Sequence, residues 1–175
     1  ALALRLAGAG VKKGDHVAIV AENSPNWGIA YFAIVRLGAV AVPVLPDLPK
    51  ADVQHILTEM RVTVIFITER QLDKIAELNQ ESRMRLIALD DSVTSQEMAA
   101  TETFAHYLAE GLALWHEAQG IPGFEKVLAE DLASILYTSG TSGFSKAVML
   151  SHRNLAANAC SASAMLDIEP GVVFV

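Results

Sequence analysis

The sequence has 175 residues, enough for one domain that buries roughly 70% of the surface of its unfolded chain. Its 52% hydrophobic content excludes a disordered chain, and a net charge of −7 without any basic run excludes a nucleic-acid-binding face. The single cysteine, Cys160, excludes an internal disulfide and a cysteine metal cluster. We expect it to be a small buried residue in a reducing, cytoplasmic protein.

Strand and helix patterns alternate along the first ninety residues. After a first helix that carries Leu2, Leu4 and Leu6, a buried strand is expected at 16–21. Ser24 and Pro25 predict the start of a helix that Gly38 ends. The order continues with strands at 39–45, 62–67 and 85–89 and with helices at 49–60 and 70–80.

The second half continues the alternation after an acidic loop at 90–100. We expect a helix at 102–119, a turn at 120–123, strands at 132–137 and 147–150, a helix from 151 or 152 to about 165, and a strand at 172–175. This order predicts an α/β fold, a mostly parallel sheet with helices on both faces. Ligands of such sheets bind at the carboxyl ends of the strands.

Glycines, hydroxyls and a lysine are concentrated between the strands at 132–137 and 147–150. Glycines let backbone N–H groups approach a phosphate chain, hydroxyls add hydrogen-bond donors, and a lysine adds positive charge. An ordinary Gly/Ser-rich hairpin would have a similar composition. The candidate phosphate-binding residues are Thr138, Ser139, Gly140, Thr141, Ser142, Gly143 and Lys146.

The glycine and lysine spacing in this segment disfavours one class of nucleotide-binding protein. A Walker phosphate loop needs a glycine, four further residues and then Gly-Lys-Ser/Thr. Here Gly140 is followed by Gly143, and Ser145 precedes Lys146. A P-loop NTPase is therefore disfavoured.

The segment 137–149 resembles the phosphate loop of the adenylate-forming superfamily, the acyl-CoA synthetases and their relatives, which reads roughly Tyr-Thr-Ser-Gly-Thr-Thr-Gly-x-Pro-Lys-Gly-Val-Met. The segments 14–25 and 36–44 are similar to two upstream segments of the same family. Ser145 stands where the family has proline, and Ala147 where it has glycine. An alanine would be strained if that position required a positive φ.

The resemblance implies a two-step reaction in which a carboxylic acid attacks Mg-ATP to give an acyl-adenylate and is then transferred to coenzyme A. ATP, Mg2+ and CoA are the implied cofactors and co-substrates. The sequence around the loop is most similar to that of long-chain fatty acid CoA ligases. Aryl-CoA ligases, amino-acid adenylation domains and a non-catalytic relic or interaction module stay as alternatives.

The resemblance also implies that residues 1–175 form a single partial domain, the N-terminal subdomain of the AMP-binding domain. The C-terminal part, with the catalytic lysine, the acyl pocket and the adenine site, would follow, so we assign no catalytic residue and expect the isolated chain to be inactive. The histidines show no metal-ligand spacing, and we assign no metal ligand. The implied partners are the small molecules and the remainder of the polypeptide. The sequence contains no transmembrane segment and stays compatible with a peripheral membrane contact.

Overall fold

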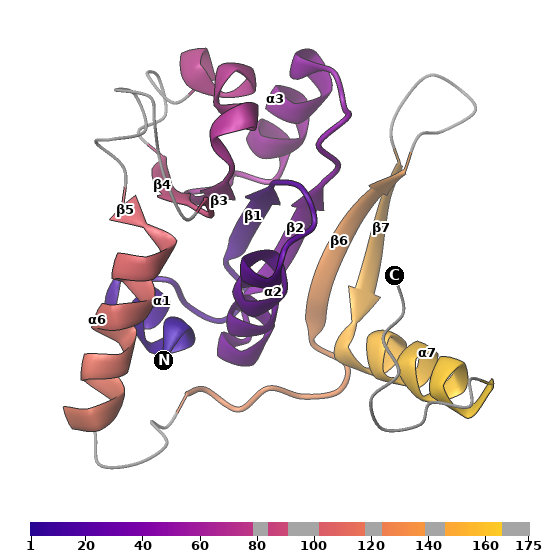
Figure 1. Ribbon diagram of the computed structural model, residues 1–175. Helices are drawn as coiled ribbons and strands as arrows, with labels where there is room; N and C mark the ends of the chain where they lie inside the picture. Colours follow the sequence, from indigo (N-terminus) through magenta and orange to yellow (C-terminus); the bar gives the residue numbers. More distant parts are fainter. Residues whose placement is uncertain (79–83, 91–101, 118–123, 139–145, 166–175) are drawn as a thin grey trace.

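The computed structural model of the chain describes residues 1–78, 84–90, 102–117, 124–138 and 146–165 (Figure 1). Helices and strands alternate through these ranges. The helices are α1 (Leu2–Gly8), α2 (Pro25–Leu37), α3 (Lys50–Glu59), the 3-10 helix η1 (Glu69–Lys74), α6 (Phe104–Glu117) and α7 (His152–Met165). The strands are β1 (His16–Val20), β2 (Val40–Val44), β3 (Val64–Ile67), β4 (Arg85–Ala88), β5 (Glu102–Thr103), β6 (Leu132–Thr138) and β7 (Lys146–Ser151).

The described strands form one seven-stranded sheet in the order β5-β4-β3-β1-β2-β6-β7. Every neighbouring pair from β5 to β6 is parallel, and only the last pair, β6 and β7, is antiparallel. The prediction of an α/β fold with a mostly parallel sheet is confirmed. The chain passes from β1 to its neighbour β2 on one side and from β3 to its neighbour β4 on the other, so the gap between β1 and β3 is the topological switch point.

Helices cover both faces of the sheet. Successive residues of a strand point to opposite faces, so the apolar residues of β1 pack against helices on both sides. Val17 and Ile19 of β1 pack in a cluster with residues of α1, α2 and α6. Their neighbours Ala18 and Val20 pack in a second cluster with residues of α3 and η1. A strand buried on both faces is apolar at successive positions rather than at alternate ones, as β1 is from Val17 to Val20.

Two predicted helices differ from those observed. The first part of the helix expected at 70–80 is the short 3-10 helix η1, where Gln71 bonds the carboxylate of Glu22 and Lys74 bonds the carbonyl oxygens of Pro46 and Leu48. Residues 76–78 are helical as predicted, and the last two predicted residues lie outside the described ranges. The helix expected at 102–119 begins at Phe104, because Glu102 and Thr103 pair with β4 as the short strand β5. The other observed elements begin and end within about two residues of the predicted bounds.

Cys160 is exposed, and the prediction that it is buried was wrong. It lies in α7, which has no buried residue because its small and polar side chains offer no large apolar face to a core. The predicted turn at 120–123, the strand at 172–175 and nearly all of the loop at 90–100 lie outside the described residues.

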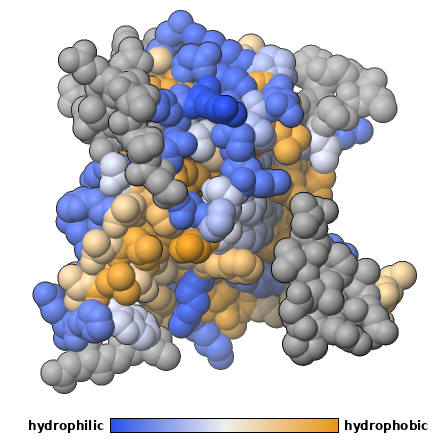
Figure 2. Space-filling model, in the orientation of Figure 1, coloured by the Kyte–Doolittle hydropathy of each residue, from blue (hydrophilic) through white to orange (hydrophobic). Residues whose placement is uncertain are grey.

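Figure 2 shows apolar side chains at the surface over α6 and α2, while the region over α3 and η1 is mainly hydrophilic. Phe32 of α2 is 70% exposed, and Leu112 of α6 is 45% exposed. Within the described ranges, no helix has the length and hydropathy that a bilayer crossing requires.

Gly38 ends α2 in the left-handed conformation, with φ +81, and a Cβ there would lie 3.0 Å from Lys13 Cγ and 3.1 Å from Val127 Cγ2. We therefore expect Gly38→Ala to lower the free energy of unfolding by about 1–2 kcal/mol in urea denaturation. Gly28, inside the same helix with open space around it, is the matched control. Gly28→Ala should raise stability by up to about 1 kcal/mol, and equal effects of both changes would contradict this role of Gly38.

Candidate functional site

The base of the predicted phosphate loop is built by the antiparallel pair β6 and β7. Thr138, the last residue of β6, faces Lys146, the first residue of β7, and its hydroxyl donates a long hydrogen bond of 3.5 Å to the Lys146 carbonyl oxygen. Both residues are exposed, and within the described ranges Lys146 forms no ion pair. The two predicted site residues thus lie side by side with a lysine free to meet an anion.

The other predicted loop residues fall in the segment between these two strands. Ser139, Gly140, Thr141, Ser142 and Gly143 lie outside the described residues. Their place in the loop follows from the two strand ends that they connect, and their contact with phosphate stays a prediction.

Strand β6 enters the loop from a fixed position. The buried Ser134 hydroxyl donates to the Ala41 carbonyl oxygen of β2 at 3.1 Å. Ala133 and Ile135 on either side of it are also buried. Because β2 and β6 are parallel, the loop leaves the sheet at the edge where β1, β2 and β3 end (Figure 1).

Tyr137, which is not among the predicted phosphate-binding residues, makes a second contact that holds the same end of β6. Its ring is 7% exposed, and its hydroxyl donates to Glu59 Oε2 of α3 at 2.5 Å. Burial and the facing carboxylate raise the pKa of Tyr137 far above its ordinary value, so the hydroxyl stays a donor. No sequence signal joins two residues 78 positions apart.

Ala147, which replaces the family's glycine, fits its position. It lies in β7 opposite Tyr137. Arg61 is the single described residue other than glycine with a positive φ, so the backbone at Ala147 is ordinary extended strand. The strain that an alanine would suffer at a left-handed position does not arise.

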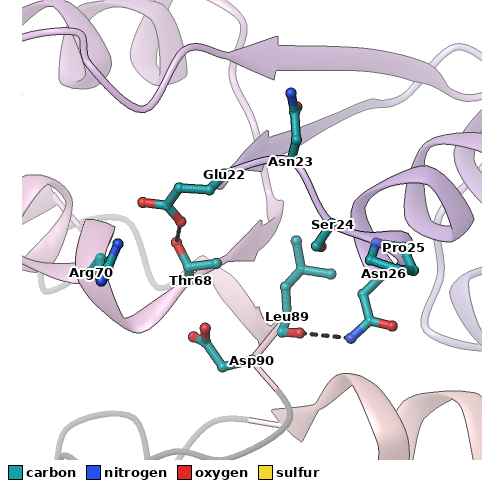
Figure 3. Close-up of a pocket in the computed structure, with 9 residues that line it drawn as sticks. All are labelled: Glu22, Asn23, Ser24, Pro25, Asn26, Thr68, Arg70, Leu89 and Asp90. Carbon is teal, nitrogen blue, oxygen red and sulfur yellow. Dashed lines mark hydrogen bonds between the residues drawn. The ribbon is translucent and has the colours of Figure 1, made fainter. Parts of the chain in front are cut away.

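A pocket of about 420 Å³ lies at the same edge of the sheet, where the switch point between β1 and β3 favours ligand binding (Figure 3). Three segments line it, the start of α2 with the residues before it, the end of β3 and the end of β4. The lining residues are Glu22, Asn23, Ser24, Pro25, Asn26, Thr68, Arg70, Leu89 and Asp90.

The polar groups of this pocket are largely engaged with the protein itself. Thr68 Oγ1 donates to Glu22 Oε2 at 2.7 Å, and Asn26 Nδ2 donates to the Leu89 carbonyl oxygen at 2.9 Å (Figure 3). Asp90 accepts from the backbone N–H of Glu69. With two carboxylates and one guanidinium, that of Arg70, the lining is net negative and unsuited to a triphosphate. The charge of its lining therefore disfavours this pocket as the phosphate site, and the base of the predicted loop at Thr138 and Lys146 stays the candidate.

The described residues offer no group of three or more His, Cys, Asp or Glu side chains placed to hold a metal ion. A Mg2+ ion that accompanies ATP keeps several waters and binds largely through phosphate oxygens, so it needs few protein ligands.

The Glu22 network makes stability depend on pH. Burial works to raise the pKa of Glu22, but the hydrogen bonds from Thr68 and Gln71 outweigh it and hold the pKa below its ordinary value of 4.5. The ionised carboxylate thus stabilises the fold above pH 4.5, and this contribution is lost as the pH falls through the lower folded-state pKa.

We therefore expect Glu22→Gln to lower the melting temperature most at neutral pH, with the difference from wild type shrinking as the pH is lowered below about 4. Thr68→Val, which deletes one donor to the carboxylate, should weaken the same pH dependence. A difference between wild type and Glu22→Gln that stays constant with pH would contradict this account.

Comparison with known proteins identifies relatives over most of the chain. The long-chain-fatty-acid–CoA ligase of Salmonella typhimurium is 29% identical over 167 residues, which cover 86% of this chain and 30% of the relative. The long-chain-fatty-acid–CoA ligase heimdall of Drosophila melanogaster is 32% identical over 183 residues, which cover 97% of this chain and 26% of the relative. The chain therefore spans less than a third of the length of these relatives.

The fold agrees with solved structures. The crystal structure of an anthranilate CoA ligase in complex with anthranoyl-AMP superposes with a TM-score of 0.75 at 23% identity, over 91% of this chain and 29% of that one. The family model of the AMP-binding enzymes matches residues 1–174, from the first helix to beyond the loop between β6 and β7. The chain thus belongs to the AMP-binding enzyme family, the adenylate-forming acyl-CoA ligases and their relatives.

Proposed function

We propose that this chain supplies the ATP-phosphate-binding loop of an acid–thiol ligase. The observation that supports the proposal is the pairing of Thr138 with Lys146 at the carboxyl edge of a parallel sheet, where the Lys146 ammonium forms no ion pair with any of the described residues. The sequence between them is rich in glycine and hydroxyls, as a phosphate cradle requires.

In the proposed reaction, a carboxylate oxygen of the acid attacks the α-phosphorus of ATP. The bond between the α-phosphorus and the bridging oxygen breaks, and pyrophosphate leaves with that oxygen. The acyl group of the resulting adenylate then passes to the sulfur of coenzyme A, which loses its proton, and AMP departs. Mg2+ bound to the triphosphate offsets the negative charge that the leaving pyrophosphate gains.

The residues of this chain would act on the leaving group. The Lys146 ammonium and the Thr138 hydroxyl would hold the β- and γ-phosphates, together with the hydroxyls of Ser139, Thr141 and Ser142 and the backbone N–H groups around Gly140 and Gly143. Fixed donors stabilise charge as it develops in the transition state and spend no energy on reorganisation. No residue here need form a covalent bond with the substrate, because this chemistry depends on positioning and charge.

We infer that the acid is a long-chain fatty acid, on the strength of the two ligases that resemble this chain over 86% and 97% of its length. Aryl acids are the second candidate, because an anthranilate CoA ligase shares the fold. The acyl pocket lies outside this chain in the resemblance, so only a substrate assay can choose between them. Cytoplasmic localisation, peripheral membrane contact and association with further polypeptide stay predictions.

We expect Lys146→Ala to lower acid-dependent pyrophosphate release by about tenfold or more, because it removes a full charge next to the leaving group. The assay uses the longest natural polypeptide that contains this sequence, with Mg-ATP and saturating acid. Lys12→Ala removes an exposed lysine that precedes the amino end of β1, the opposite end of the parallel strands from the loop, so this variant is the control and should behave as wild type. Unchanged release by Lys146→Ala would remove Lys146 from the proposed site.

A further inference from the structure

The hydrogen bond between Tyr137 and Glu59 links two parts of the molecule that serve different purposes. Glu59 is the last residue of α3, a helix that covers one face of the sheet. Tyr137 is the residue of β6 directly before Thr138, where the phosphate loop begins. The 2.5 Å contact between Tyr137 Oη and Glu59 Oε2 therefore ties the loop base to a helix on the covering layer.

The ring of Tyr137 and its hydroxyl are held by different forces. The ring packs in the cluster that contains Val53, Ile56 and Leu57 of α3. The hydroxyl donates to the carboxyl group of Glu59 at 2.5 Å, the short distance of a strong O–H···O hydrogen bond. A phenol buried in this way needs a polar partner, and Glu59 supplies it. The packing of the ring and the hydrogen bond of the hydroxyl thus fix the end of β6 against α3, in addition to its pairing with β7.

Within the described residues, the carboxylate of Glu59 has two charged or polar side-chain neighbours, Tyr137 and His55. The other neighbour of Glu59 is His55 Nε2, 3.6 Å from the same oxygen on a side chain that is 68% exposed. An exposed pair of this kind contributes little to stability. The short bond to Tyr137 is the main directed interaction of Glu59.

We propose that Glu59 is a positioning residue for the phosphate loop, acting through the Tyr137 hydroxyl, an inference that rests on the proposed function. The hydroxyl of Tyr137 bonds Glu59 of α3, and its backbone pairs with Ala147 of β7. Thr138 and Lys146, which flank the loop, are therefore held in defined positions. Loss of the bond frees the strand end by a fraction of an ångström, and displacements of that size matter for donors aimed at a developing charge.

The test measures kcat and KM for ATP and, separately, for the acid in the longest natural polypeptide that contains this sequence. Glu59→Ala and Tyr137→Phe should each lower kcat/KM for ATP by about tenfold while KM for the acid stays within about twofold of wild type. Glu59→Gln keeps an acceptor oxygen and should recover most of the loss. The double variant should be no worse than either single one, because both changes remove the same bond.

His55→Ala is the matched control, since it removes the other neighbour of Glu59 and should leave all constants unchanged. Thermal unfolding of each variant separates a folding defect from a shift in ATP kinetics, and Tyr137→Phe, the loss of one oxygen, keeps the test open if Glu59→Ala does not fold. Three results with an active wild type would overturn the role of Glu59 and leave the proposed function standing. These are losses in the double variant that equal the sum of the single losses, equal losses for ATP and for the acid, and no loss in any variant. A wild type without acid-dependent activity would overturn the proposed function and this inference with it.

Discussion

Burial of the parallel sheet on both faces is the constraint on which the rest of the structure depends. Val17 and Ile19 face one helical layer, and Ala18 and Val20 face the other, so neither face of β1 is open to a ligand. Backbone groups and polar side chains can then meet a ligand only where the strands end. The base of the predicted phosphate loop, at the end of β6, and the pocket lined by Glu22 and Thr68 both lie at this edge. Their net charges, not their positions, distinguish them.

The strand that carries the loop is tied to its surroundings by three kinds of interaction. The Ser134 hydroxyl donates a hydrogen bond to a backbone carbonyl oxygen of β2, and the Tyr137 hydroxyl donates one to Glu59 of α3. The antiparallel pairing of β6 with β7 begins at Lys146, directly after the loop. A loop that must present several donors to one ligand benefits from ends that do not move. The ordinary strand geometry of Ala147 also removes the one sequence feature that favoured a non-catalytic relic.

The sequence predicts those features of the fold that depend on local pattern and leaves out those that depend on tertiary contact. The Ser24 and Gly38 signals locate α2 to the residue, and the apolar runs locate β1 and β3. The 3-10 helix η1 and the strand β5 were not predicted, because they form through contacts with Glu22, Pro46 and β4 that are distant in sequence. For the same reason the motif predicts a role for Lys146 but gives no indication of Glu59, which is linked to the loop base only through its hydrogen bond to Tyr137.

The central claim is best tested by acid-dependent pyrophosphate release from Mg-ATP, measured on the longest natural polypeptide that contains this sequence. Acetate, hexanoate, hexadecanoate, benzoate and mixed amino acids would each be supplied in turn. The account predicts strong stimulation by hexadecanoate and little by the shorter or aromatic acids. Stimulation by benzoate alone would reassign the acid to the aryl class, and absence of release with every acid would contradict the account of the loop as a catalytic phosphate site.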